Sequence, residues 1–86
     1  MTKAEIFQDV KQIFRRVFLN DGLQVDLKST AMDVPGWDSF KMIEILLEVE
    51  KRFGTKMETR DIDRLKNVGD LVTRIADKLP KSILQH

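Results

Sequence analysis

Apolar residues recur at intervals of three and four positions in three stretches of this chain, residues 3–19, 39–53 and 68–79. That interval places the apolar side chains of each stretch on one face of a helix. Three such helices in 86 residues bury their faces against one another, which predicts a small all-α bundle. The face residues are Ile6, Val10, Ile13 and Val17, then Met42, Ile45, Leu46, Val49 and Phe53, then Val68, Leu71, Val72, Ile75 and Leu79.

The ends of the first two helices carry typical start and stop residues. Thr2, with Glu5 three positions later, predicts a capping box at the start of the first helix. An Asn-Asp-Gly sequence follows that helix, and we expect Gly22 to end it with a positive φ angle. Gly54 is expected to end the second helix.

The second half of the chain predicts two further elements. A short helix is expected over residues 60–65, and Asn67 is the expected N-cap of the last helix. We expect a single domain over residues 1–86, with an ordered core from about 3–80 and a frayed tail over 81–86. The bundle therefore contains three main helices and one short helix.

Between the first two helices, residues 23–37 show no helical interval. Leu23, Val25 and Leu27 alternate as in a strand, but a lone strand would lack a partner. We therefore expect a long ordered loop whose apolar residues hold it on the core. A Pro-Gly pair ending at Gly36 predicts a turn just before the second helix. A loop of this length in a small domain is often functional.

Composition and charge exclude several classes of protein. A chain with 42% apolar residues is too apolar to be disordered, and a net charge of +1 argues against nucleic-acid and anionic-membrane partners. The absence of cysteine excludes disulfides, thiolate catalysis and cysteine-ligated metals. No apolar run reaches the roughly 20 residues of a membrane span, and the N-terminus lacks the apolar core of a signal peptide. We therefore expect a cytoplasmic protein.

The sequence offers no convergent catalytic site. The one histidine, His86, is the last residue, so no Ser/His pair is available as nucleophile and base. There is no glycine-rich phosphate loop, and acids spaced two apart, such as Glu48 and Glu50, do not face each other on a helix. These observations predict a protein that is not an enzyme and binds no metal of its own.

Asp38 and Ser39 at the start of the second helix allow two interpretations. Either residue is a common N-cap, which would make the pair purely structural. Alternatively, a phosphate ester on Ser39 would be stabilised by the exposed N–H groups and the positive end of the helix dipole. In that case Asp38 could hold a divalent cation, which prefers hard oxygen ligands, while the phosphate is delivered.

The second helix also carries a second apolar stripe, formed by Phe40, Ile43 and Leu47. A helix that is apolar over so much of its circumference is either deeply buried or offers a docking surface, and both remain open. Glu44 and Glu48 border the stripe at a spacing where like charges destabilise a helix slightly. A basic partner would offset that cost.

The order of these features resembles the acyl carrier protein family over residues 4–79. The matching residues are Asp38-Ser39-Phe40, the run from Glu50 to Phe53-Gly54, the apolar Met57 and the pair Asn67-Val68. The resemblance implies that Ser39 bears 4′-phosphopantetheine through a phosphodiester, installed from coenzyme A by a phosphopantetheinyl transferase with magnesium, in which Asp38 assists. The terminal thiol of that arm would carry an acyl, hydroxyacyl or aminoacyl group as a thioester, and the carrier itself would catalyse nothing.

The resemblance also implies roles for other positions and a monomeric protein. Its partners would be the transferase, an acyl-activating ligase or acyltransferase, and a downstream synthase or transferase. Partner docking maps onto Phe40, Glu44, Leu47 and Glu48 of the second helix. Candidate walls of an acyl cavity are Met57, Ile62, Leu65 and Leu71.

This sequence departs from the carriers of primary fatty-acid synthesis, which are strongly acidic along the second helix. Here Lys41, Lys51 and Arg52 balance the acids of that helix. The balance favours a stand-alone carrier of a specialised pathway. The main alternative is a non-catalytic helical interaction domain in which Ser39 is only a cap. A nucleic-acid-binding domain is disfavoured, because acids interleave with the small basic cluster of the first helix.

Overall fold

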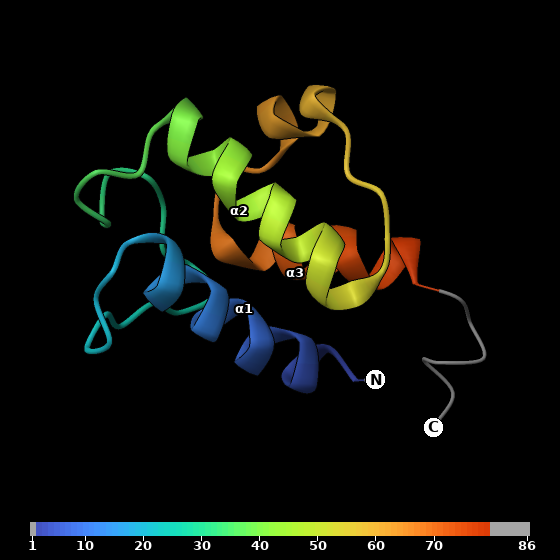
Figure 1. Ribbon diagram of the computed structural model, residues 1–86, viewed down its shortest axis with the longest axis horizontal. Coiled ribbons are helices and arrows are strands. Elements are labelled where there is room, and N and C mark those ends of the chain that lie inside the picture. Colours follow the sequence, from blue (N-terminus) through green and yellow to red (C-terminus); the bar gives the residue numbers. More distant parts are fainter. Residues whose placement is uncertain (1, 80–86) are drawn as a thin grey trace.

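A computed structural model describes residues 2–79, with residues 59, 61 and 62 described for their backbone alone. The element order is α1 (Lys3–Val17), α2 (Ser39–Phe53), η1 (Thr59–Arg64) and α3 (Val68–Lys78). Figure 1 shows α1 and α2 lying along one another with α3 behind them, and η1 beside α2. The predicted all-α bundle is confirmed. The predicted fourth helix is a short 3-10 segment rather than an α-helix. Residues 80–86, where we expected the tail, lie outside the described residues.

The apolar faces predicted from the sequence form the core. Every face residue is buried except Phe53, which packs half-buried against the others. Phe14 of α1 adds the largest fully buried side chain. Each fully buried aliphatic or aromatic side chain contributes about 1.5–3 kcal/mol relative to exposure, so burial of these three faces is the main interaction that holds the helices together.

The two ends of α1 differ in how well the sequence predicted them. The capping box is confirmed, because the Glu5 N–H donates to Thr2 Oγ1 (3.2 Å) and the Thr2 N–H donates to Glu5 Oε1 (2.9 Å). The hydrogen bond from the Thr2 backbone is the main reason why the pKa of Glu5 is lowered. The prediction for Gly22 was wrong. The left-handed residue after α1 is Leu19, with φ 51°, because the chain already reverses there.

At the ends of α2 and α3 the predicted residues act as expected. Gly54 follows α2 with φ 66°, and its N–H donates to the carbonyl of Glu50 (3.0 Å). The Asn67 side chain accepts the N–H of Asp70 (2.7 Å) at the start of α3. Glycine is favoured after α2 because residues with a side chain are strained in the left-handed region. Asparagine is favoured before α3 because its side chain satisfies a free N–H group of the first turn.

The connection from α1 to α2 is an ordered loop, as predicted. Within residues 2–79 it forms no strand, only an isolated bridge between Thr30 and Asn67. Val25 and Val34 are buried and hold it on the core. The Pro-Gly turn is confirmed: Gly36 has φ 85°, and the Trp37 N–H donates to the carbonyl of Val34 (3.1 Å), as in a type II turn.

The loop is also bonded to the first turn of α3. The N–H of Val68 donates to the carbonyl of Ser29 (3.0 Å), and the N–H of Gly69 donates to the carbonyl of Leu27 (2.8 Å). A Cβ atom on Gly69 would lie 2.9 Å from that carbonyl oxygen. Only glycine therefore allows the loop backbone to approach α3 this closely, although glycine is otherwise unfavourable within a helix.

Replacing Gly69 with alanine should therefore destabilise the protein, although alanine favours helices. We expect the free energy of unfolding to fall by about 1–2 kcal/mol in urea titrations, because backbone rather than a flexible side chain must move. Gly22→Ala is the matched control, since its Cβ would meet nothing closer than 3.7 Å. That variant should stay within about 0.5 kcal/mol of wild type. Equal effects in both variants would contradict the close approach at Gly69.

Candidate functional site

The start of α2 is fixed in place by Trp37. Its ring is buried and meets the ring of Phe14 edge-on, with centroids 5.1 Å apart and an interplanar angle of 88°. Its Nε1–H group points at the sulfur of Met42 at 3.3 Å. Edge-to-face pairs of this kind add about 0.5–1.5 kcal/mol to the burial of the rings. The tryptophan therefore ties the end of the loop to both α1 and α2.

Asp38 is the N-cap of α2. Its Oδ1 atom accepts the N–H of Lys41 (2.9 Å), and its carbonyl accepts the N–H of Met42 (2.9 Å). The other carboxylate oxygen makes no hydrogen bond with any described residue, and the side chain is exposed. One oxygen thus satisfies the helix, and the second is free to ligate a cation.

Ser39 is the first residue of α2 and does not cap it. The residue is exposed, and its hydroxyl makes no hydrogen bond with any residue of the described part of the chain. Asp38 therefore caps the helix, and the Ser39 hydroxyl has no capping role. An exposed hydroxyl without a structural task can be modified without breaking a contact.

The surroundings of Ser39 suit a phosphate ester. The N–H groups of Ser39 and Phe40 precede the first hydrogen bonds of α2, so they are available to an anion. Apart from the N-cap Asp38, the first turn of α2 contains no acidic residue. A phosphodiester on the Ser39 hydroxyl would therefore fit the residues present here.

A hollow of about 230 Å³ adjoins Ser39. It lies where the loop before α2 meets the segment between η1 and α3, and it includes one cationic residue, Lys66. No local sequence pattern predicts this hollow, because its walls come from parts of the chain far apart in sequence. The lining residues are Ala31, Trp37, Asp38, Ser39, Met42, Leu65 and Lys66.

The four candidate wall residues of an acyl cavity are placed differently. Leu65 is half-buried and lines the hollow beside Ser39. Met57 and Leu71 are buried in the core and do not line that hollow. The backbone of Ile62 lies in η1, and its side chain is outside what the structure describes.

The second apolar stripe of α2 is exposed. Phe40 is 68% exposed, Ile43 41% and Leu47 52%, although the opposite face of the same helix is fully buried. Large apolar side chains that gather on one exposed helix face are typical of a docking surface. Of the two interpretations that the sequence left open for this stripe, deep burial is wrong, and docking stays a prediction.

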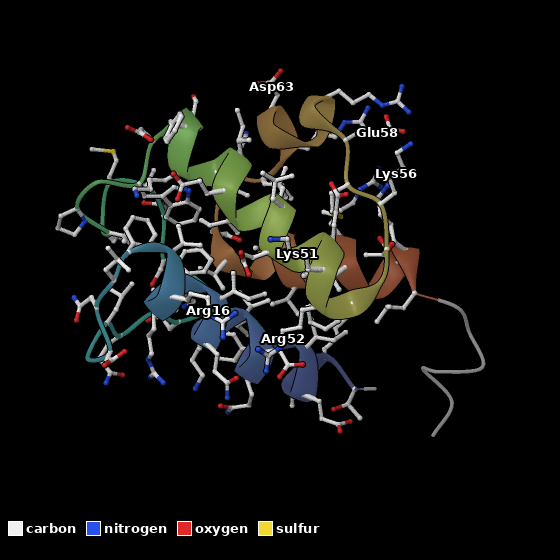
Figure 2. The ribbon with its side chains drawn as sticks, viewed as in Figure 1. Arg16, Lys51, Arg52, Lys56, Glu58 and Asp63 are labelled. Carbon is white, nitrogen blue, oxygen red and sulfur yellow. The ribbon has the colours of Figure 1, made fainter. Side chains whose placement is uncertain are left out.

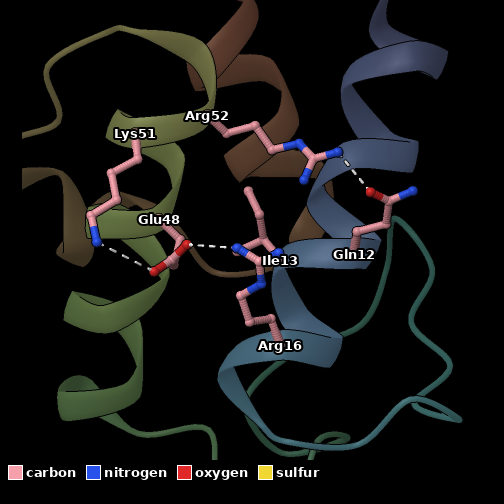
Figure 3. A pocket seen from close by; sticks show the side chains of 6 residues that line it. All are labelled: Gln12, Ile13, Arg16, Glu48, Lys51 and Arg52. Atoms are coloured by element: carbon pink, nitrogen blue, oxygen red, sulfur yellow. Dashed lines mark hydrogen bonds and ion pairs between the residues drawn. The ribbon is translucent and has the colours of Figure 1, made fainter.

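The acids beside this stripe are already paired within the chain. Glu44 lies 3.5 Å from the Lys41 ammonium, and Glu48 lies between Arg16 (3.7 Å) and Lys51 (3.8 Å), as Figure 3 shows. The repulsion expected between two acids one turn apart is therefore reduced by the chain itself. A basic partner would therefore relieve less repulsion between Glu44 and Glu48 than the sequence alone suggests.

Two further findings concern metals and membranes. Among residues 2–79, no group of three or more His, Asp or Glu side chains could hold a metal ion. The helices in this part of the chain are too short or too polar to cross a bilayer.

Comparison with known proteins connects this geometry to one family. Residues 8–75 match the family model of the phosphopantetheine attachment site. The chain is 32% identical to the acyl carrier protein of Thermotoga maritima over 78 residues, covering 91% of this chain and 96% of the relative. It is 30% identical to the acyl carrier protein of an Exiguobacterium species, covering 92% and 100%. The solution NMR structure of the holo acyl carrier protein from Geobacter metallireducens superimposes with a TM-score of 0.79 at 29% identity, covering 93% and 92%.

The different roles of Asp38 and Ser39 can be separated by stability measurements. Asp38→Ala should lower the free energy of unfolding by about 0.5–2 kcal/mol, because the N–H of Lys41 loses its acceptor. Ser39→Ala should change it by less than about 0.5 kcal/mol, since no contact is lost. Denaturant titrations of both variants beside wild type measure the difference. A larger loss in Ser39→Ala than in Asp38→Ala would show that the serine is the cap after all.

Proposed function

The chain belongs to the acyl carrier protein family, and from this premise we propose that Ser39 is the residue that bears its phosphopantetheine. A member of this family is a carrier with a covalently attached 4′-phosphopantetheine, not an enzyme. The observation that supports Ser39 is its exposed hydroxyl, which has no structural hydrogen bond because Asp38 does the capping. The arm supplies the thiol that a cysteine-free chain lacks, and acyl groups are held on it as thioesters.

In this proposal each residue at the start of α2 has a defined task during loading. The Ser39 oxygen forms a bond to the phosphorus that carries pantetheine, and its proton passes to a base on the transferase. The bond from that phosphorus to the bridging oxygen of the diphosphate breaks, and the nucleotide half of coenzyme A leaves with the other phosphate. The free carboxylate oxygen of Asp38 would hold a magnesium ion, which would neutralise charge on the diphosphate. The free N–H groups of Ser39 and Phe40 stabilise the resulting phosphodiester.

The exposed stripe of α2 would then receive the enzymes that act on the arm. Phe40 and Leu47 are the apolar anchors, and Glu44 and Glu48 lie beside them as polar contacts. We assign to this surface the phosphopantetheinyl transferase, a loading ligase or acyltransferase, and a downstream synthase or transferase. The carried group is an acyl, hydroxyacyl or aminoacyl intermediate, which is shuttled between these enzymes.

The charges of α2 support a stand-alone carrier of a specialised pathway. Lys41 pairs with Glu44, Lys51 pairs with Glu48, and Arg52 pairs with Asp9 of α1 (3.1 Å). A helix neutralised in this way lacks the strong negative field that steers acidic carriers to basic enzymes. The single domain, the monomeric state and the cytoplasmic location stay predictions.

The acyl cavity is also part of the proposal. Leu65 is the wall residue best placed for it, because it lines the hollow next to Ser39. Met57 and Leu71 could contribute only if an acyl chain entered the core between α2 and η1.

The alternative function is a helical interaction domain in which Ser39 is only a helix cap. The position of Asp38 argues against it, because Asp38 is the residue that caps α2.

Loading tests the assignment of Ser39 directly. Incubation of the purified chain with coenzyme A, magnesium and a promiscuous phosphopantetheinyl transferase should increase its intact mass by one phosphopantetheinyl group. Ser39→Ala should gain nothing while keeping its fold. Ser29→Ala is the matched control, because it removes the hydroxyl of the other described serine, which is bonded within its own loop. Loading of Ser39→Ala, or none of a wild-type sample confirmed to be unmodified, would contradict the assignment.

The docking stripe is tested with a neutral substitution. Leu47→Gln should raise the KM for the carrier in the transferase reaction about five- to tenfold. The reason is that the exposed part of the leucine side chain would lose its apolar contact with the transferase. Its melting temperature should change little, since the side chain is 52% exposed. Leu27→Gln is the matched control: that leucine is 48% exposed but lies in the loop against α3. An equal rise in KM for both variants would argue against a specific stripe.

A further inference from the structure

A second surface adjoins the α2 stripe along the boundary with α1. We call it the α1–α2 groove; it has a volume of about 300 Å³. Its lining residues are Gln12, Ile13, Arg16, Glu48, Lys51 and Arg52 (Figure 3). A neighbouring hollow shares Arg16, Glu48 and Lys51 with this groove and adds Leu19 and Leu47. The groove is therefore continuous with the α2 stripe through Leu47.

The charges of the groove are not balanced by its own acid. A single carboxylate, Glu48, lies between the Arg16 guanidinium at 3.7 Å and the Lys51 ammonium at 3.8 Å. Both cationic side chains are mostly exposed, at 72% and 77%. One anion shared by two exposed cations leaves a net positive charge and unused N–H donors.

The third cation of the groove is already satisfied. Arg52 donates to Asp9 (3.1 Å) and to Gln12 (2.6 Å) on α1, as Figure 3 shows for the glutamine. It therefore holds α2 against α1. The positive charge open to a partner comes from Arg16 and Lys51, which project from different helices on the same side of the molecule (Figure 2).

Leu19 gives an independent reason to look at this surface. It has φ 51°, a conformation that is unfavourable for a leucine and common for glycine. Its left-handed backbone ends α1, where the N–H groups of Leu19 and Asn20 donate to the carbonyls of Arg16 (3.2 Å) and Arg15 (2.9 Å). The cap does not require a leucine, yet the side chain here is apolar and 91% exposed, and large exposed apolar side chains mark binding surfaces.

We propose that the surface formed by Leu19, Leu47, Arg16 and Lys51 docks an acidic segment of a partner enzyme. The segment presents an apolar side chain to the two leucines and carboxylates to the arginine and lysine. This inference rests on the proposed carrier function, and it assigns the partner a charge opposite to that expected for carriers with an acidic second helix. Of the two acids that line this surface, Glu44 is paired with Lys41 and Glu48 lies between Arg16 and Lys51, so three cations face two acids.

Peptide titration tests the charge of the partner. The full-length chain, labelled with ¹⁵N, is titrated at low ionic strength with a short peptide in which two leucines are flanked by glutamates. A second peptide has lysines in place of the glutamates. We expect the acidic peptide to shift amide signals around Leu19 and Leu47 in a saturable way, and the basic peptide to bind more weakly.

Charge variants show whether the groove is responsible. R16E/K51E should weaken binding of the acidic peptide about tenfold and favour the lysine peptide. R16Q/K51Q, which adds no acid beside Glu48, should lose the preference without reversing it. K28E/K56E is the matched control, with the same change of net charge at exposed positions that line neither hollow. Absence of acidic-peptide binding, equal binding of both peptides, or an equal loss in K28E/K56E would overturn the proposal.

Leu19→Gly separates docking from stability. Glycine relieves the left-handed strain, so the melting temperature should rise, while acidic-peptide binding should weaken severalfold because an apolar anchor is lost. Unchanged binding in this variant would remove Leu19 from the surface. The mass assay measures loading and the titration measures peptide binding, so a failure of the carrier function is distinguishable from a failure of this proposal.

Discussion

The packing of Trp37 determines where the proposed attachment site, Ser39, lies. Its ring fills the space between Phe14 of α1 and Met42 of α2, and the residue comes directly before Asp38 and Ser39. The start of α2 therefore cannot move without opening the core. A carrier must present its attachment point to several enzymes in turn, and a rigid entry to the helix gives each of them the same geometry.

Asp38 and Ser39 at the start of α2 have different tasks, although both residue types commonly cap helices. The cap requires a side-chain oxygen directed back at the N–H of the third helical residue, which Asp38 provides. Attachment requires a hydroxyl directed at solvent, which Ser39 provides from the first helical position. Because the cap does not depend on Ser39, an arm attached to that residue would leave the fold unchanged. The free N–H groups of the first turn would then stabilise the added phosphate without any rearrangement of α2.

The helices and most of their caps follow from sequence because they depend on local intervals and local hydrogen bonds. Gly22 shows the limit of that reasoning: glycine permits a left-handed residue, but the packing of α1 places the reversal at Leu19. The roles of Asp38 and Ser39 could not be separated either, since both residue types cap helices equally well. The hollow at Ser39 depends on Ala31 and Lys66 meeting across the bundle, which no local pattern records. Family resemblance, rather than periodicity, supplied the chemistry of the arm.

The charge of a docking surface also depends on contacts between helices. Read along α2 alone, Glu44 and Glu48 suggest an acidic face for a basic partner. In the fold, Lys41 neutralises the first acid within the helix, and Arg16 reaches from α1 to the second. With Lys51 on its other side, Glu48 is outnumbered by exposed cations. The field that a partner meets beside the apolar stripe is therefore set by α1 as much as by α2, and enzymes specific for this carrier would differ in charge from those that recognise an acidic helix.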